Sequence, residues 1–168
     1  MKKINIQHHQ TPVGELILGS FNTKLCLADF NNRKARLSID KRIQHKLNAQ
    51  YIEKPSDAIE SFIFQLDEFF NGVRQTFDID LLMAGTAFQQ NVWNTLLKIP
   101  YGETRSYRQL AQSLSKEKAV RAVANANAAN ALSIIIPCHR VISSNGQLTG
   151  YAGGLDAKKY LLNLEQSK

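Results

Sequence analysis

The sequence has few of the residues and segments that mark secreted, membrane or metal-binding proteins. Its 168 residues include only two cysteines, Cys26 and Cys138, so no disulfide framework is expected and Cys138 is predicted to be a free thiol. No C-x-x-C or H-x-x-H pair is present, which argues against a metal site. No apolar run has the length of a membrane span or, near the start, of a signal peptide. We therefore expect a cytoplasmic protein with no metal, no cofactor and no membrane contact.

Basic residues are in excess. The 21 lysines and arginines stand against 14 aspartates and glutamates, which gives a net charge of +7 and an isoelectric point near 9.5. Such a charge favours an anionic partner, and nucleic acid is the commonest one. A basic surface that only keeps the protein in solution is the alternative, so charge alone does not decide.

The first half of the chain predicts a sheet with helices. Alternating apolar and polar residues with turn signals between them indicate antiparallel strands at 4–6, 15–18 and 25–30. The basic segment 31–48 is predicted to be a surface connection, helical in part. A helix is expected over 56–71, with Ser56 as its N-cap and Gly72 just after its end. A further strand is expected at 76–82, and a boundary at 83–85 divides the chain into domains 1–82 and 86–168.

The second half predicts helices that begin with capping boxes, in which a Thr or Ser is followed three residues later by Gln. The boxes are Thr86 with Gln89 and Ser106 with Gln109. The second helix stops at Ser115, and a third is expected from 116 to about 129, as in a helix-turn-helix. That third helix is rich in alanine and would carry on one face Lys118, Arg121 and Asn125. The alternative is an ordinary alanine-rich helix with one solvated stripe.

A chemically reactive cluster follows the third helix. The apolar segment 132–136 ends at Pro137 and predicts buried, extended chain, so Cys138 emerges where the interior meets the surface. That location suits a nucleophilic thiol, although a merely packed cysteine is common. On an extended backbone His139 would point away from Cys138. Glu165 closes a helix predicted over 156–165, where the helix dipole disfavours a carboxylate by a few tenths of a kcal/mol.

Four segments together resemble a known family. "FQQNVWNTLLKIPYGETRSYRQLA", "RAVANANAAN", "IPCHRVI" and "GYAGGLDAKKYLLNLE" occur in the order and spacing of the O6-alkylguanine-DNA alkyltransferases, also called methylated-DNA-protein-cysteine methyltransferases. The resemblance is strong from about Phe88 to Glu165 and looser before it. It implies an α/β (α+β) fold: a ribonuclease H-like N-terminal domain with an antiparallel sheet and a helix, and a mostly helical C-terminal domain with a helix-turn-helix of winged-helix type.

The resemblance implies direct repair of alkylated DNA. A member of the family moves the alkyl group from guanine O6, and less readily from thymine O4, onto its own cysteine in a single irreversible turnover, and acts as a monomer on the minor groove of double-stranded DNA. Cys138 matches the acceptor. His139 and Glu165 match the pair that takes the thiol proton through water, and Asn130 matches the residue that orders the hinge before the active-site segment.

The remaining expected roles concern DNA and the flipped base. Tyr107 and Arg121 match the residues that rotate the damaged nucleotide out of the duplex, and Tyr107 can also protonate the leaving base. Contacts to DNA are further expected from Lys118, Ala122 and Asn125. The base pocket is expected to include Tyr151, Ala152, Gly153 and the main chain at Cys138 and Val141.

Two positions depart from the family pattern, and three rival functions are weighed against it. Ala131 follows Asn130 where many relatives have proline, and Ala152 stands where some members have serine. A non-catalytic lesion sensor on the same scaffold would lack Cys138. A plain helix-turn-helix regulator would carry long polar side chains for the major groove, which the alanine-rich helix lacks. A cysteine hydrolase would need an oxyanion loop, and the sequence has no sign of one.

Overall fold

A four-stranded mixed sheet organises the first part of the chain. Its strands are β1 (Lys2–Thr11), β2 (Gly14–Phe21), β3 (Lys24–Phe30) and β4 (Ala49–Glu53), in the order β3-β2-β1-β4. β1, β2 and β3 pair antiparallel as predicted, and β1 and β4 pair parallel. The expectation of a purely antiparallel sheet is therefore wrong for β4. The chain leaves one edge of the sheet after β3 and joins the other edge at β4, so it needs a crossover.

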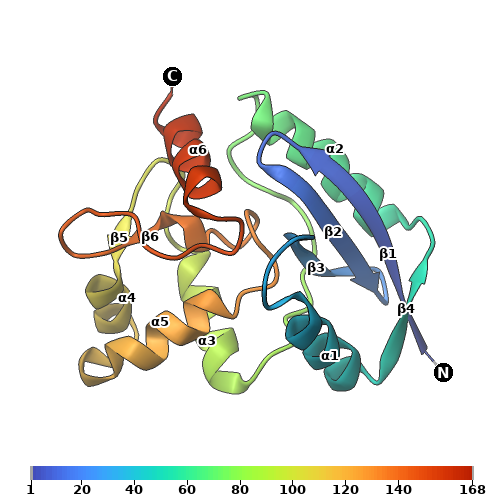
Figure 1. The fold of residues 1–168 in the computed structure, drawn as a ribbon, viewed down its shortest axis with the longest axis horizontal. Coiled ribbons are helices and arrows are strands. Elements are labelled where there is room, and N and C mark those ends of the chain that lie inside the picture. Colours follow the sequence, from blue (N-terminus) through green and yellow to red (C-terminus); the bar gives the residue numbers. More distant parts are fainter. Residues whose placement is uncertain (1, 168) are drawn as a thin grey trace. The chain divides into compact units, whose positions relative to one another are not determined.

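The structure is a computed structural model and describes residues 2–167. The chain divides into two units, Met1–Gly85 and Thr86–Lys168, each described by itself below. Both units combine helices with strands, in agreement with the predicted α/β class (Figure 1).

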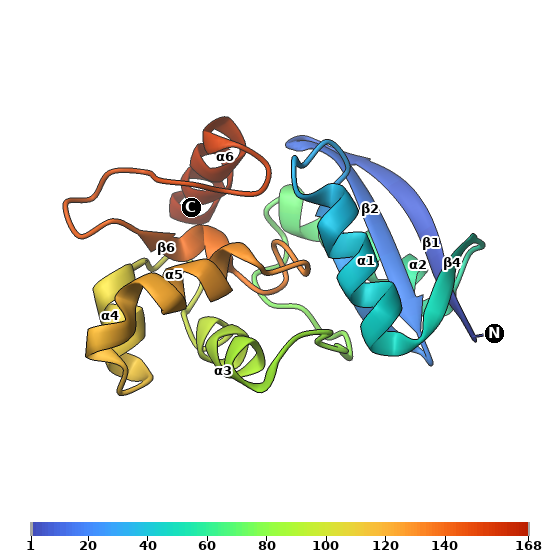
Figure 2. The same cartoon turned by 60° about the horizontal axis from the view of Figure 1, so that its bottom comes forward.

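Two helices of the first unit cover opposite faces of its sheet. Figure 2 shows α1 (Arg36–Leu47) in front of the strands and α2 (Asp57–Phe70) behind them. Burial agrees, because β2 and β3 are buried almost continuously rather than at alternate residues. The basic segment contains a full helix because Ile39 and Ile43, one turn apart, are buried against the protein. Leu37 lies on the opposite side and is 67% exposed.

The ends of α2 are fixed by local hydrogen bonds, as the sequence predicted. The Ser56 hydroxyl accepts from the Ile59 backbone N–H at 3.2 Å and contacts the Ser20 hydroxyl at 2.6 Å. At the other end Gly72 has a φ of +77° and donates its N–H to Phe69, while Val73 donates to Glu68. These two bonds form a Schellman motif, which favours glycine at the left-handed position.

The strand expected at 76–82 does not form. Only Leu81 bridges to Leu25 in β3. One reason is Gln65 of α2, whose side-chain amide binds both the N–H of Asp78 at 2.8 Å and its carbonyl at 3.1 Å. The Gln65 side chain thus forms hydrogen bonds that the backbone of a neighbouring strand would otherwise form, and residues 76–82 pack mostly as irregular chain.

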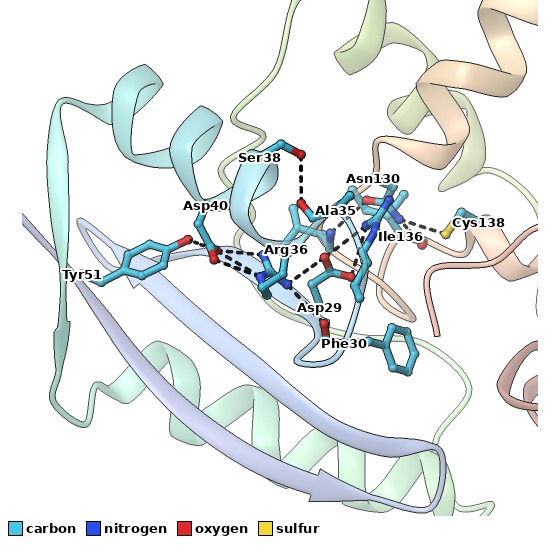
Figure 3. A network of polar contacts seen from close by, with 12 residues as sticks. Asp29, Phe30, Ala35, Arg36, Ser38, Asp40, Tyr51, Asn130, Ile136 and Cys138 are labelled. Atoms are coloured by element: carbon cyan, nitrogen blue, oxygen red, sulfur yellow. Dashed lines mark hydrogen bonds and ion pairs between the residues drawn. The ribbon is translucent and has the colours of Figure 1, made fainter. Parts of the chain in front are cut away.

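Helix α1 is tied to two strands by a network of charged groups (Figure 3). Asp29, fully buried at the end of β3, accepts from Arg33 at 3.1 Å and from Arg36 at 2.9 Å. Arg36 also binds Asp40 at 2.9 Å, and Asp40 accepts a 2.6 Å hydrogen bond from the hydroxyl of Tyr51 in β4. Burying Asp29 is tolerable because two guanidinium groups neutralise it.

The second unit consists mainly of helices. They are α3 (Ala87–Leu96), α4 (Tyr107–Ser113), the 3-10 turn η1 (Glu117–Ala119), α5 (Val120–Ala128), the 3-10 turn η2 (Cys138–Arg140) and α6 (Leu155–Gln166). β5 (Arg105–Ser106) and β6 (Val141–Ile142) pair parallel. Both predicted capping boxes are present, at the starts of α3 and α4. The indole N–H of Trp93 in α3 donates to the Ala126 carbonyl of α5 at 2.8 Å and joins those helices.

We predict that Ser56→Ala lowers the free energy of unfolding by about 1 to 2 kcal/mol, because the substitution removes the N-cap of α2 and a partner of buried Ser20. Urea unfolding measures the change. Ser61→Ala is the matched control: Ser61 is exposed on the same helix, and the expected change is within about 0.5 kcal/mol. Equal effects of the two substitutions would contradict the capping role.

Candidate functional site

The segment before Cys138 is a tight buried turn. The Ile135 N–H donates to the Ser133 carbonyl and the Ile136 N–H to the Leu132 carbonyl, both at 2.9 Å, and Ile134 has a φ of +75°. The prediction of extended chain over 132–136 is therefore wrong, although its burial is confirmed. A β-branched residue in this conformation is strained by about 1 to 3 kcal/mol. Burial of the surrounding isoleucines and leucine holds the turn in place.

Cys138 and His139 lie on a 3-10 turn, η2, and not on extended backbone. The Cys138 N–H bonds to the Ile136 carbonyl at 2.8 Å, and the Arg140 N–H bonds to the Pro137 carbonyl at 3.0 Å. Successive side chains on such a turn are about 120° apart rather than opposite. The objection that adjacency would separate the thiol from the imidazole is thereby removed.

Asn130 binds both the thiol and the chain that leads to it. Its amide nitrogen lies 3.2 Å from the Cys138 sulfur and donates to the Ile136 carbonyl at 3.0 Å, as Figure 3 shows. Its amide oxygen accepts from the Leu132 N–H at 3.0 Å. None of these bonds involves the side chain at position 131, so they form with alanine there. Cys138 itself is 5% exposed.

His139 and Glu165, which the resemblance implied to act as a pair, are in direct contact. His139 Nε2 lies 2.8 Å from Glu165 Oε2, and both side chains are buried. Burial lowers the pKa of His139, so the neutral imidazole is favoured. An ionised Glu165 can only accept, so Nε2 carries the proton and Nδ1 has its lone pair free. Nδ1 is buried and has no hydrogen-bond partner within residues 2–167.

Arg140 is the residue of this site that the sequence reasoning missed. Its Nε donates to Glu165 Oε1 and its Nη2 to Oε2, both at 2.8 Å, and its Nη1 binds the Ile99 carbonyl at 2.7 Å. Burial alone would raise the pKa of Glu165, but the hydrogen bonds from His139 and Arg140, together with the charge of Arg140, lower it to about 2. The unfavourable carboxylate at the end of α6 was the signal that a buried cation was needed.

Further expected site residues lie near the two-stranded sheet formed by β5 and β6. The rings of His139 and Tyr151 meet edge to face, with centroids 6.4 Å apart. The hydroxyl of Tyr107, the first residue of α4, lies 3.4 Å from the Thr149 hydroxyl. β5 precedes Tyr107 directly and pairs with β6, which begins at the buried Val141. Partly buried positions next to Tyr151 are Ala152 and Gly153.

The helix expected at 116–129 is interrupted. Residues 117–119 form the 3-10 turn η1, and the α-helix begins only at Val120, so Lys118 does not share a regular helix face with Arg121 and Asn125. All three side chains are nevertheless exposed, as is Ala122. The buried side of α5 consists of Val123, Ala126 and Asn127. Arg121 is thus exposed on α5, whereas Cys138 is buried.

Neither metal ligands in a cluster nor membrane-spanning helices are found in the described part of the chain. Residues 2–167 contain no group of three or more His, Cys, Asp and Glu side chains that could hold a metal ion. Over the same residues, no helix has both the length and the apolarity needed to cross a membrane.

The geometry places a buried thiol next in sequence to a buried histidine–carboxylate pair, and comparison with known proteins gives the family of the chain. Residues 87–167 match the family model described as the 6-O-methylguanine DNA methyltransferase DNA-binding domain. A methylated-DNA–protein-cysteine methyltransferase of Methanosarcina barkeri is 43% identical over 164 residues, which are 94% of each chain. The constitutive one of Bacillus subtilis is also 43% identical, over 94% of this chain and 92% of its own.

Solved structures agree. The crystal structure of Mycobacterium tuberculosis OGT in complex with DNA has a TM-score of 0.81 and 35% sequence identity, covering 98% of this chain and 92% of that one. The chain therefore belongs to the methylated-DNA–protein-cysteine methyltransferase family, and it is an enzyme of that class.

We predict that ionised Glu165 contributes about 3 kcal/mol to the stability of the second unit, since its pKa is about 2 in the fold and near 4.3 in unfolded chains. The folded pKa is depressed, so this contribution is complete at neutral pH and is lost as the pH falls from about 4.3 through about 2. Urea unfolding followed by the fluorescence of Trp93, the single tryptophan, measures it. Glu165→Gln should lower stability at neutral pH and abolish this acid dependence.

Glu117→Gln is the control for Glu165→Gln, because it removes the same charge from an exposed position in the same unit. Its expected effect is within about 0.5 kcal/mol at every pH. A Glu165→Gln protein whose stability falls in parallel with that of the unsubstituted protein below pH 4 would contradict the assignment.

Proposed function

We propose that the protein repairs alkylated DNA directly by moving the alkyl group from guanine O6 to the sulfur of Cys138. The single observation that carries this proposal is the arrangement of a nearly buried thiol, bound to Asn130 and next in sequence to an imidazole held by Glu165. Family membership supplies the substrate class. Thymine alkylated at O4 is a second, poorer substrate.

The proposed activation of the thiol uses the free side of His139. One water bridges the Cys138 thiol and His139 Nδ1, and the proton passes through it to the imidazole. Glu165 keeps the opposite nitrogen protonated, so Nδ1 stays the acceptor. Arg140 holds both carboxylate oxygens and thereby fixes the orientation of the whole pair.

The transfer itself is a displacement at the alkyl carbon. The sulfur of Cys138 forms a bond to that carbon while the bond from the carbon to guanine O6 breaks, and the electron pair goes to the base. Tyr107 donates a proton to the leaving base and regains one from solvent. A thioether has no easy route back to a thiol, so each molecule acts once.

The second unit is proposed to bind DNA as well. Residues 86–168 hold ten lysines and arginines against four aspartates and glutamates, whereas residues 1–85 hold eleven against ten. Most of the net positive charge therefore belongs to the second unit. α4 and α5 act as a helix-turn-helix of winged-helix type, with α5 in the minor groove. The small residues of α5 permit close approach, and Arg121 is a long exposed side chain among them.

The damaged nucleotide is flipped into a pocket formed by Tyr151, Ala152, Gly153 and the carbonyls of Cys138 and Val141. Tyr107 crowds the phosphate, and Arg121 fills the gap that the base leaves, while Lys118, Ala122 and Asn125 contact the backbone of the duplex. Extrusion costs a few kcal/mol, which Arg121 and the pocket offset. Domain 86–168 carries both DNA binding and the acceptor, the ribonuclease H-like domain 1–82 supports it, and the protein works as a cytoplasmic monomer.

We predict that incubation with duplex DNA containing labelled O6-methylguanine transfers the label to Cys138 and stops at one equivalent per protein. Mass spectrometry of the digested protein locates the label. Cys138→Ala should take up none, whereas Cys26→Ala is the control and should retain full transfer, because Cys26 is buried in the first unit. Turnover beyond one equivalent would refute the single-use mechanism.

We predict that Arg121→Ala slows repair of duplex DNA by at least about tenfold more than it slows reaction with free O6-benzylguanine, because only the duplex requires extrusion. Rates of alkyl transfer to both substrates measure this. Arg108→Ala removes the same charge from an exposed position on α4 and is the control for a general loss of affinity. Equal losses on both substrates in Arg121→Ala would count against insertion into the stack.

A further inference from the structure

Lys158, in the second turn of α6, is a fully buried amine that the mechanism above does not use. Its side chain has an exposed fraction of 0%. The ammonium donates to the Val141 carbonyl at 2.7 Å and to the Thr149 carbonyl at 2.8 Å. It therefore connects the strand that follows the reactive turn with the loop that precedes Tyr151.

Among residues 2–167, the ammonium of Lys158 forms hydrogen bonds but no ion pair. Both of its acceptors are neutral carbonyls, and no carboxylate among residues 2–167 lies within ion-pair distance of it. A buried ammonium without a counter-ion is costly, and a buried lysine is usually paired. Hydrogen bonds alone could be supplied by a neutral side chain. The position thus indicates a need for positive charge at this place.

The group that can balance this charge is the thiolate of Cys138. α6 packs directly on the turn η2, which carries Cys138. Lys158 binds Val141, the residue that directly follows this turn. The Lys158 ammonium is held by its 2.7 Å hydrogen bond at Val141, three residues after Cys138. In agreement with that position, burial lowers the pKa of Lys158 and the charge of Cys138 acts in the opposite direction. Lys158 also disfavours a positive charge on His139.

The other ionisable groups around the reactive turn leave this role open. Arg140 and Glu165 neutralise each other through two hydrogen bonds, and the rings of Tyr151 and His139 meet edge to face. His139 is buried and neutral at neutral pH. Lys158 is thus the net charge on the buried side of the site.

We propose that Lys158 is a positioning residue whose buried ammonium is the counter-charge of the Cys138 thiolate, while its two hydrogen bonds hold Val141 and Thr149 at the base pocket. The thiol proton passes by way of His139 to solvent, since Lys158 opposes a lasting charge on the imidazole. The sulfur then remains as a stabilised thiolate, ready for displacement. This inference deepens the proposed function and rests on Cys138 as the acceptor.

The test is the ionisation of Cys138 in the free protein, which needs no DNA and no alkyl transfer. Titration of the thiolate absorbance in the ultraviolet gives the pKa, and the pKa of Cys26, raised by burial to about 12, keeps that thiol out of the neutral range. Lys158→Gln keeps a hydrogen-bond donor without the charge, and Lys158→Met removes both. We expect each to lower the thiolate fraction at neutral pH by at least about tenfold.

Lys159→Met is the matched control, because it removes the same charge from the next residue, which is exposed. It should leave the ionisation of Cys138 unchanged. An unchanged pKa of Cys138 in Lys158→Gln, or an equal change in Lys159→Met, would overturn the inference and leave Lys158 as a structural clamp. Thermal melts identify a variant that does not fold.

If neither Lys158 variant folds, the pKa of Cys138 in the unsubstituted protein is the test instead. A Cys138 pKa clearly below the ordinary value of about 8.5 supports the counter-charge, and a value at or above it overturns it. Failure of label transfer from DNA together with a depressed thiol pKa would instead refute the proposed function and leave the role of Lys158 intact.

Discussion

The pairing of Glu165 with Arg140 and His139 is the interaction on which the reactive part of the structure depends. A carboxylate at the end of a helix and away from water is unfavourable on two counts, the dipole and desolvation. A bidentate guanidinium and an imidazole offset both. The same contacts anchor the turn that carries Cys138 to α6 and select the imidazole tautomer, so one buried carboxylate determines both the architecture and the chemistry.

The thiol is held from the other side by neutral groups. One asparagine side chain satisfies the backbone at Leu132 and Ile136 and also contacts the sulfur. The chain turns within a few residues, and this tight turn requires the left-handed conformation of Ile134. Strain of this kind persists only where packing and hydrogen bonds fix the surroundings, and here both converge on a single reactive atom.

The sequence predicted features whose causes are local. Capping boxes need residues three apart, and both appear where Thr86 and Ser106 predicted them. The parallel pairing of β4, the replacement of a strand by Gln65 and the role of Arg140 depend on residues distant in sequence, and no periodicity carries that information. The turn at Ile134 was missed because an isoleucine-rich segment favours strand, and only its tertiary surroundings override that preference.

The hydrogen bonds of Asn130 make the connection between α5 and η2 a link of fixed length. Their acceptors and donors lie two, six and eight residues after it, and each must reach the same amide group. A single inserted or deleted residue would move the sulfur off the amide, whereas the loop over 143–150 is mostly exposed and several of its hydrogen bonds join residues of the same loop. Variation in length among proteins built on this plan should therefore be confined to that loop, and the spacing from the asparagine to the cysteine should be constant.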